Sequence, residues 1–466
     1  MRWRLIGGSG LVALYTMFAL FHMGWYVSLL GEQRYYRSDA LHLYAAAQIV
    51  MDGKGSRLYD IDLQQRYQAA MPKRFSELLP FNHPPYTAAL IAPLARFPFL
   101  VLYLLFSLGQ LAAYAFAIWM LHPWWGRWSR TEKTFFLVIA STFVCVFHAV
   151  HWANPALFVF LLVVLAFRSS YRKPSAVSSG IWLALSTIKP HMVIGLFWAF
   201  VCGRRWRPLF SATLTLGALI GLAITVVGVE GTLSFGQTAL STYRAGETGR
   251  FGIKPENMPN FRGLLALTDL SNSGVASGSL AFVAAVALFL FWLWRSRPKD
   301  TDPASESLRW AVTIPLVLLA SPHLYGQDVS LAVFSGMLLY DAARNLSFQR
   351  RMVGVFVLIA PLASQICFFL AGRFGKVPWN PWPPCNAIIL LVLAFLALVV
   401  MISIKYPRSS EVAGPLKMGA ISTVVRPVPH ASARPKQNIP KHAVAIRRSD
   451  YAACDSQEAL VPPAMF

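Results

Sequence analysis

The sequence predicts an all-α polytopic membrane protein, and three features support this class. Hydrophobic residues make up 56% of the 466 positions and charged residues only 13%, and a soluble domain could not bury that much apolar surface. Three runs without Asp, Glu, Lys or Arg, at 5–31, 97–126 and 134–167, each exceed the roughly 20 residues that cross a bilayer as a helix. Short loops rich in Lys and Arg separate the apolar segments, which is typical of cytoplasmic loops.

The apolar segments predict about twelve transmembrane or re-entrant helices with both termini in the cytoplasm. Two arginines precede the first segment and place the N-terminus inside. The run 134–167 is long enough for a helical hairpin with its tip at 148–155. The run 174–203 has a single charge, Lys189, at its middle, and its two arms are short enough for tilted or re-entrant helices. The other predicted spans are 5–31, 98–121, 209–228, 276–294, 308–320, 329–342, 352–371 and 386–404.

Residues 1–404 form the predicted membrane domain, which has two long outer loops. The first, 31–97, contains segments expected to form short amphipathic helices, and the second is 229–275. Residues 405–466 lose the hydrophobic periodicity and are rich in Pro, Ala, Ser, Lys and Arg. This composition predicts a basic, disordered cytoplasmic tail that contacts lipid.

The net charge of +22 needs no nucleic-acid partner in this class of protein. Lys and Arg collect on cytoplasmic loops, where they contact anionic lipids. The five cysteines are odd in number and scattered, without a CxxC pair, which indicates neither a disulfide framework nor a zinc site. We therefore expect membrane lipids as partners, and neither a metal nor another cofactor.

Polar and ionisable residues from six short segments converge on the predicted outer face. Such residues are costly near membrane depth and commonly mark a functional site, so we predict a cavity at this face. The candidate residues are Asp39, His42, Tyr44, His83, Asn154, Lys189, His191, Asn257, His323 and Asp328.

Asp39 has two interpretations. Ser38 suits an N-cap, and residues 40–51 have helix-forming composition before the glycines at 53 and 55. Asp39 would then be the first helical residue, with His42 one turn further on the same face. A carboxylate there either complements the helix dipole or acts as a general base on an acceptor hydroxyl, and the local sequence does not decide between these roles.

Lys189, between its two apolar arms, also has two interpretations. The side chain either extends to the interface or binds a phosphate at the membrane surface, with His191, His323 and His83 as donors to phosphate or sugar oxygens. A single histidine is more often an ordinary hydrogen-bonded residue. Asp328 either caps the helix that follows it or lines the cavity.

Four short motifs occur in an order that resembles a known family. They are Ser38-Asp39 with the G-x-x-LYD segment at 55–60, FNHPPY at 81–86 with the Pro-containing run 92–98, Ile-Lys-Pro-His at 188–191, and the Ser-Pro loop at 321–328. Together they resemble glycosyltransferase family 87 over about residues 10–400. The chain departs from the family pattern at 152–155, at His191, and at Tyr325 and Asp328.

The resemblance implies a GT-C architecture. It also implies an inverting enzyme that transfers a hexose, commonly mannose, from a polyprenyl-phosphate donor to a lipid or glycan acceptor on the extracytoplasmic face of a bacterial inner membrane. The expected base is the Asp of the first outer loop, which is Asp39. The residues expected to bind donor phosphate or sugar are Lys189, His191, His323, Asp328 and His83, and those expected near the acceptor are His42, Tyr44, Asn154 and Asn257.

Two alternatives stay open at this point. A secondary transporter of a polar or lipid-linked solute would show paired repeats with broken helices near mid-membrane, and no such repeat is visible in the sequence. A non-catalytic relative that serves as an assembly partner would not need the Asp at position 39.

Overall fold

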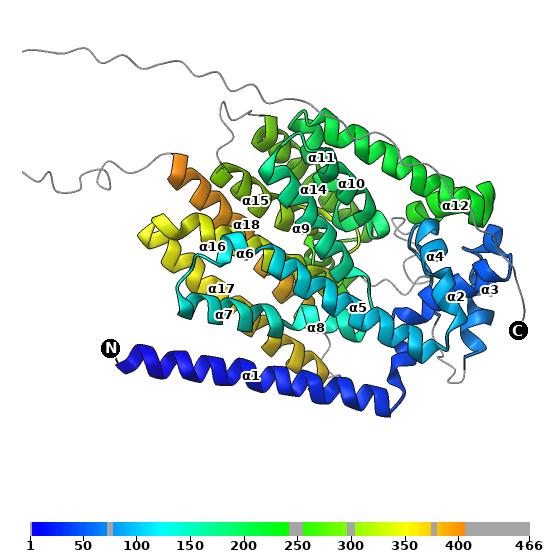
Figure 1. Cartoon of the computed structure of the whole chain (residues 1–466), viewed down its shortest axis with the longest axis horizontal. Helices are drawn as coiled ribbons and strands as arrows, with labels where there is room; N and C mark the ends of the chain where they lie inside the picture. The colour runs from blue at the N-terminus through cyan, green and yellow to red at the C-terminus, as the bar shows by residue number, and fades with distance from the viewer. Residues whose placement is uncertain (1, 72–77, 242–254, 296–302, 374–379, 406–466) are drawn as a thin grey trace, which may run out of the picture. The chain divides into compact units, whose positions relative to one another are not determined.

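The structure, a computed structural model, describes residues 2–71, 78–241, 255–295, 303–373 and 380–405. Every regular element in these ranges is a helix (Figure 1), which confirms the all-α polytopic class. The chain divides into the units Met1–Arg408 and Ser409–Phe466. The second unit, with nearly all of the predicted tail at 405–466, lies outside the described residues.

Seven helices in the described part of the chain are long and apolar enough to cross a membrane. They are α1 (Arg2–Gly31), α5 (Phe99–Met120), α7 (Arg130–Thr142) continued by α8 (Val144–His151), α12 (Trp206–Ser241), α14 (Asn272–Arg295), α17 (Ser347–Arg373) and α18 (Trp382–Lys405). Large apolar side chains such as Leu108, Leu288 and Phe395 are exposed on these helices. Exposed apolar side chains along long apolar helices are expected where the solvent is lipid, so the chain is an integral membrane protein.

The other five predicted spans are occupied by shorter or more buried helices. They are α9 (Ala156–Arg172), α10 (Val177–Leu185), α11 (Ile194–Cys202), α15 (Pro303–Ala320) and α16 (Leu331–Ala342). Each of α10 and α11 has nine residues and rises only about 14 Å, because an α-helix advances 1.5 Å per residue. That is less than half of the roughly 30 Å of hydrocarbon. The run 174–203 is therefore two half-length helices that meet near Lys189.

The predicted second outer loop begins later than expected. Residues 229–241 continue α12 beyond a kink at Gly228, whose φ is 77°. Glycine adopts a positive φ without a Cβ clash, so the chain turns sharply at this non-helical residue and a second helical segment follows it. A Cβ on Gly231 would lie 2.7 Å from the carbonyl oxygen of Gly55, so the absence of a side chain lets the extension pack on the first outer loop. Residues 242–254 of this loop lie outside the described residues.

Three short helices of the first outer loop lie together beyond the end of α5 (Figure 1). They are α2 (Ala40–Met51), α3 (Ile61–Ala69) and α4 (Pro85–Ile91). Helix α2 is buried on nearly every side, and Leu41, Leu43 and Ile49 are at most 1% exposed. Because α2 is enclosed by its neighbours, Asp39 at its start has a fixed position.

Candidate active site

Asp39 begins α2 without capping it. Its carboxylate receives no N–H of the helix; instead Oδ2 accepts a hydrogen bond from Nδ2 of Asn154 at 2.5 Å. The N–H of Asp39 donates to the carbonyl of Trp152 at 2.9 Å. Ser38, predicted as the N-cap, donates its hydroxyl to the carbonyl of Tyr35, so that prediction is wrong. The helix dipole alone does not account for a carboxylate that points at a side chain more than 100 residues away.

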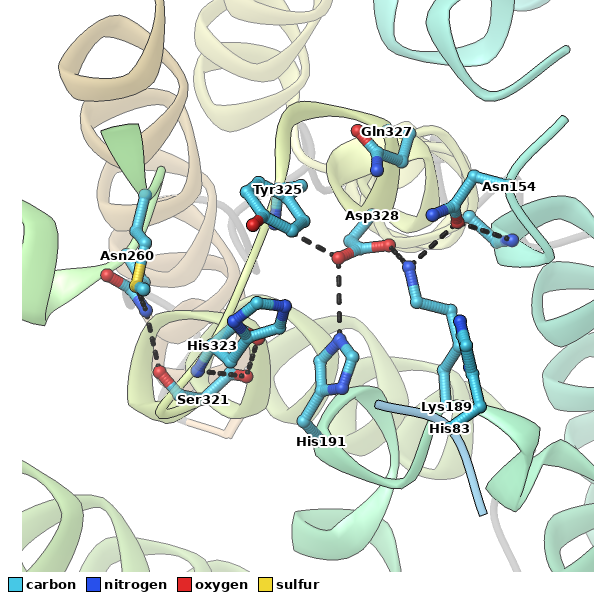
Figure 2. A network of polar contacts seen from close by, with 12 residues as sticks. His83, Asn154, Lys189, His191, Asn260, Ser321, His323, Tyr325, Gln327 and Asp328 are labelled. Atoms are coloured by element: carbon cyan, nitrogen blue, oxygen red, sulfur yellow. Dashed lines mark hydrogen bonds and ion pairs between the residues drawn. The ribbon is translucent and has the colours of Figure 1, made fainter. Parts of the chain in front are cut away.

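Asp39 is the first of four side chains, each from a different loop, that are joined by hydrogen bonds and an ion pair. Oδ1 of Asn154 accepts a hydrogen bond from Nζ of Lys189 at 2.8 Å, and Nζ also forms an ion pair with Oδ1 of Asp328. Figure 2 shows Lys189 between Asn154 and Asp328. The side chains of Lys189 and Asp328 are 3% and 0% exposed. We call Asp39, Asn154, Lys189 and Asp328 the relay.

Local backbone geometry places each member of the relay. Asn154 lies at the tip of the predicted α8–α9 hairpin, in a turn where Ala153 has a φ of 48°. Lys189 precedes a proline, which disfavours helical geometry; with φ −129° and ψ 79° it separates η4 (Ser186–Ile188) from η5 (Pro190–Met192). Asp328 lies in η7 (Gly326–Ser330), where Oδ2 accepts the N–H of Tyr325 at 3.0 Å.

Four histidines lie around Lys189 and Asp328. We call them, His42, His83, His191 and His323, the histidine group. Nε2 of His191 lies 3.5 Å from Oδ2 of Asp328, and the rings of His191 and His323 meet edge to face at 5.2 Å. His42 and His83 are stacked at 5.5 Å. Among the described residues, Nε2 of His42 and Nδ1 of His323 have no hydrogen-bond partner. Buried polar atoms without a partner suit a site that receives a polar ligand.

The tautomer of His83 follows from its partner. Nδ1 lies 2.9 Å from the carbonyl oxygen of Ile188, and a carbonyl oxygen only accepts, so Nδ1 carries the hydrogen. In a neutral ring Nε2 is then an acceptor. Burial lowers the pKa of His83 to about 4, and the positive charge of Lys189 adds to the effect. His83 therefore presents a lone pair, not an N–H donor, to the space around it.

The two carboxylates of the relay differ in proton affinity. Burial raises the pKa of Asp39 to about 6, although the hydrogen bond from Asn154 and the charge of Lys189 oppose the shift. Burial would also raise the pKa of Asp328, but Lys189 and His191 outweigh it and hold that pKa far below its usual value. Burial also lowers the pKa of His191. Asp328 is therefore a permanent anion, whereas Asp39 gains and loses a proton near neutral pH.

Two predicted residues do not reach the relay. The hydroxyl of Tyr44 donates to the carbonyl of Phe97 at 3.1 Å, and its ring packs on Phe99 in the core of the first outer loop. Asn257 is exposed in η6 (Pro255–Asn257).

Sequence reasoning missed Asn260, which is fully buried. Its Nδ2 donates to the carbonyl of Ser321 at 2.7 Å, and its Oδ1 caps α13 (Phe261–Ala266) through the N–H of Gly263. An asparagine directly before an apolar helical stretch is an N-cap signal, so this residue could have been found.

Aromatic side chains border the relay on the side of α8. Nδ1 of His148 lies 3.1 Å from Oε1 of Gln327, which precedes Asp328 in the sequence. The ring of His148 packs on Trp382 and Trp152. A Cβ on Gly326 would lie 2.0 Å from Trp382, so only glycine lets this loop pass the indole. Within the described ranges, no three His, Cys, Asp or Glu side chains are grouped to hold a metal ion.

Comparison with known proteins identifies the family of the chain. Residues 81–322, a little over half of the chain, match the model of glycosyltransferase family 87. The match includes Asn154 and Lys189 of the relay, whereas Asp39 and Asp328 lie outside it. Searches of curated proteins and of solved structures returned no match. On the family match and the membrane-spanning helices, the chain belongs to glycosyltransferase family 87, a family of membrane glycosyltransferases.

Proposed function

We propose that the protein transfers a hexose, commonly mannose, from a polyprenyl-phosphate donor to a lipid or glycan acceptor with inversion. The observation that supports this most is the position of Asp39. Its carboxylate turns away from its own helix and ends a relay that contains a buried lysine. Such an arrangement fixes the direction of one carboxylate, which is what a general base needs.

In the proposed reaction, Asp39 removes the proton from an acceptor hydroxyl. The hydroxyl oxygen forms a bond to the anomeric carbon as the bond from that carbon to the phosphate oxygen breaks, and polyprenyl phosphate leaves as an anion. Oδ2 of Asp39 is held by Asn154, so we assign proton removal to Oδ1. A pKa of about 6 leaves the carboxylate ionised at pH 7 and still basic, which is the range suited to a general base.

His191 and His323 are the proposed donors to the phosphate. His191 lies beside Asp328 and His323 packs edge to face on His191, while Lys189 adds a positive charge through its ion pair with Asp328. His83 has a different proposed role, because its neutral ring accepts at Nε2 and would repel a phosphate oxygen. We assign it to a sugar hydroxyl, with the stacked ring of His42 beside it.

The charges of the site predict that the donor binds together with a proton. Lys189 is one cation against two carboxylates, Asp39 and Asp328, and burial keeps His191 neutral. A phosphate anion next to His191 favours its protonated form. The charged groups that act on His191 are Asp328 and Lys189, and the ring that packs on it is the imidazole of His323. A proton on His191 would therefore offset the negative charge that the phosphate adds to the two carboxylates.

The proposed location is a bacterial inner membrane, with both termini cytoplasmic and the relay at the extracytoplasmic face. The short loops rich in Lys and Arg support this orientation. The half-length helices α10 and α11 resemble the broken helices of transporters. Membership of a glycosyltransferase family favours transfer over transport, and the same membership and the relay at Asp39 favour a catalyst over an assembly partner.

The test is Asp39→Asn in proteoliposomes, with radiolabelled polyprenyl phosphomannose and a total membrane lipid extract as acceptor. Loss of general-base catalysis lowers a rate by about 10²–10⁴, so we expect transfer to fall by at least two orders of magnitude. The matched control is Asp62→Asn, because Asp62 is an exposed acid in the same loop segment. Near wild-type transfer by Asp39→Asn would exclude the base assignment.

A further inference from the structure

A second candidate site, which is apolar, lies among α7, α16, α17 and α18. It is a cavity of about 140 Å³ whose walls include Phe136, Phe143, Val357, Pro361 and Leu393, and we call it the apolar slot. An apolar cavity of roughly 150 Å³ stays free of water and accepts an apolar guest. The slot lies in a membrane-embedded bundle, so a hydrocarbon chain is the guest available to it.

Small residues keep the slot open. Ala332, Gly336, Gly354 and Ala360 contribute to its walls. A Cβ on Gly336 would lie 3.7 Å from Cγ2 of Val357, an ordinary contact distance. A side chain at position 336 would therefore fit at its base and extend into the space of the slot, which makes this position suitable for a blocking substitution.

One end of the slot is polar and carries paired charges. Glu132 forms an ion pair with Arg350 and accepts the hydroxyl of Tyr340 at 2.5 Å. Arg127 forms an ion pair with Asp341. The side chain of Arg127 is 55% exposed and that of Arg350 is 41% exposed, whereas the side chain of Asp341 is only 6% exposed. The acids therefore face the protein, and the cations face outward.

The rim around this end is positive. Segments 122–133 and 341–351 contain six Lys or Arg residues and two acids. Among the described residues, Nε of Arg344 is buried without a hydrogen-bond partner. A basic rim at the end of an apolar slot matches a lipid with an anionic headgroup and a hydrocarbon tail.

The polar end of the slot is far from the relay. Helix α7, with 13 residues, and helix α8, with eight, follow one another from the rim to the turn that holds Asn154, on either side of the extended residue Phe143. At 1.5 Å per residue they rise about 20 Å and 12 Å. A headgroup on the rim therefore lies at the opposite membrane surface from the donor phosphate proposed above.

We propose that the apolar slot binds one acyl chain of an anionic phospholipid, with the phosphate on Arg127 and Arg350. This inference is independent of the proposed donor and acceptor. Helix α16 begins directly after η7, which contains Asp328, and ends beside Asp341 at the rim. The bound lipid therefore stabilises the far end of the helix that follows Asp328 of the relay.

The test is native mass spectrometry of the delipidated full-length protein titrated with phosphatidylglycerol, phosphatidylcholine or polyprenyl phosphate. We expect one phosphatidylglycerol to bind at least tenfold more tightly than phosphatidylcholine. The double variant Arg127→Gln/Asp341→Asn removes the exposed cation without leaving a buried acid unpaired, and it should abolish the preference. Gly336→Leu should weaken binding of both phospholipids, and Arg295→Gln, an exposed arginine on α14, should behave as wild type.

Three outcomes would overturn the proposal. They are equal affinity for the two phospholipids, an unchanged preference in the double variant, and displacement of bound phosphatidylglycerol by polyprenyl phosphate, which would assign the slot to the donor tail. The double variant replaces the exposed Arg127 together with its buried partner Asp341, so no charge is left unpaired, and its result decides the question even if Gly336→Leu does not fold.

Discussion

Replacing Asn154 with leucine removes the amide that joins Asp39 to Lys189 while keeping a side chain of similar shape. Asn154 donates to Asp39 at 2.5 Å and accepts from Lys189 at 2.8 Å. Without the amide, the ionised form of Asp39 loses its hydrogen-bond donor. We therefore expect the pKa of Asp39 to rise above its present value.

The size of the change follows from the strength of the lost contact. A hydrogen bond to a charged group contributes about 1.5–3 kcal/mol, and 1.36 kcal/mol corresponds to one pKa unit. The pKa of Asp39 would rise from about 6 to roughly 7–8. At pH 7 the ionised fraction would fall from about nine-tenths to between one-half and one-tenth, so kcat/KM would fall about two- to tenfold from protonation alone.

The assay is the pH profile of kcat/KM in proteoliposomes for wild type, Asn154→Leu and Asn272→Leu. Asn272 is an exposed asparagine at the start of α14 and should leave the profile unchanged. With the donor at a saturating concentration, so that its own pH-dependent binding does not enter, we expect the acid limb of Asn154→Leu to move up by one to two pH units. An acid limb that stays near pH 6 would refute the coupling between Asn154 and the base.

Two further predictions concern donor binding and stability. The donor is proposed to bind together with a proton on His191. The KM for the donor should therefore rise as the pH increases from 6 to 8, by up to tenfold per pH unit for one proton. In His191→Ala the KM for the donor should be nearly independent of pH. Glu306→Ala removes the carboxylate that pairs with buried Arg205. Removing one partner of a buried ion pair lowers the free energy of unfolding by about 3–5 kcal/mol. Thermal unfolding should therefore occur at a clearly lower temperature, while the protein that stays folded keeps its KM for the donor.

The sequence was sufficient to predict the membrane class and the loops that supply the site. Uncharged runs and basic loops follow directly from the cost of placing charges and free backbone groups in lipid. The α8–α9 hairpin with Asn154 at its tip and the short arms around Lys189 were predicted from the same pattern. These features depend on local composition, which a single sequence contains.

Other features depend on pairings that no local pattern encodes. Lys189 and Asp328 are 139 positions apart. Both were expected near the donor, but no local pattern predicted that they form an ion pair. The extension of α12 was missed because a glycine near the end of an apolar helical run is a possible C-cap. Here Gly228 instead bends a helix that packs on the glycine at position 55. Tyr44 and Asn257 lie on the correct loops, but burial of the tyrosine and exposure of the asparagine depend on tertiary packing.

The relay also determines the orientation of its central amide. Lys189 is only a donor and an ionised Asp39 is only an acceptor, so the amide of Asn154 fits between them in one orientation. Rotation of the amide by 180° would place its NH₂ group against the ammonium and its oxygen against the carboxylate. Lys189 is itself held in place by Asp328, which also accepts the N–H of Tyr325. The buried ion pair costs desolvation energy, and it holds the amide of Asn154 with its donor on Oδ2 of Asp39. Oδ1 is then the oxygen left for the acceptor hydroxyl in the proposed reaction.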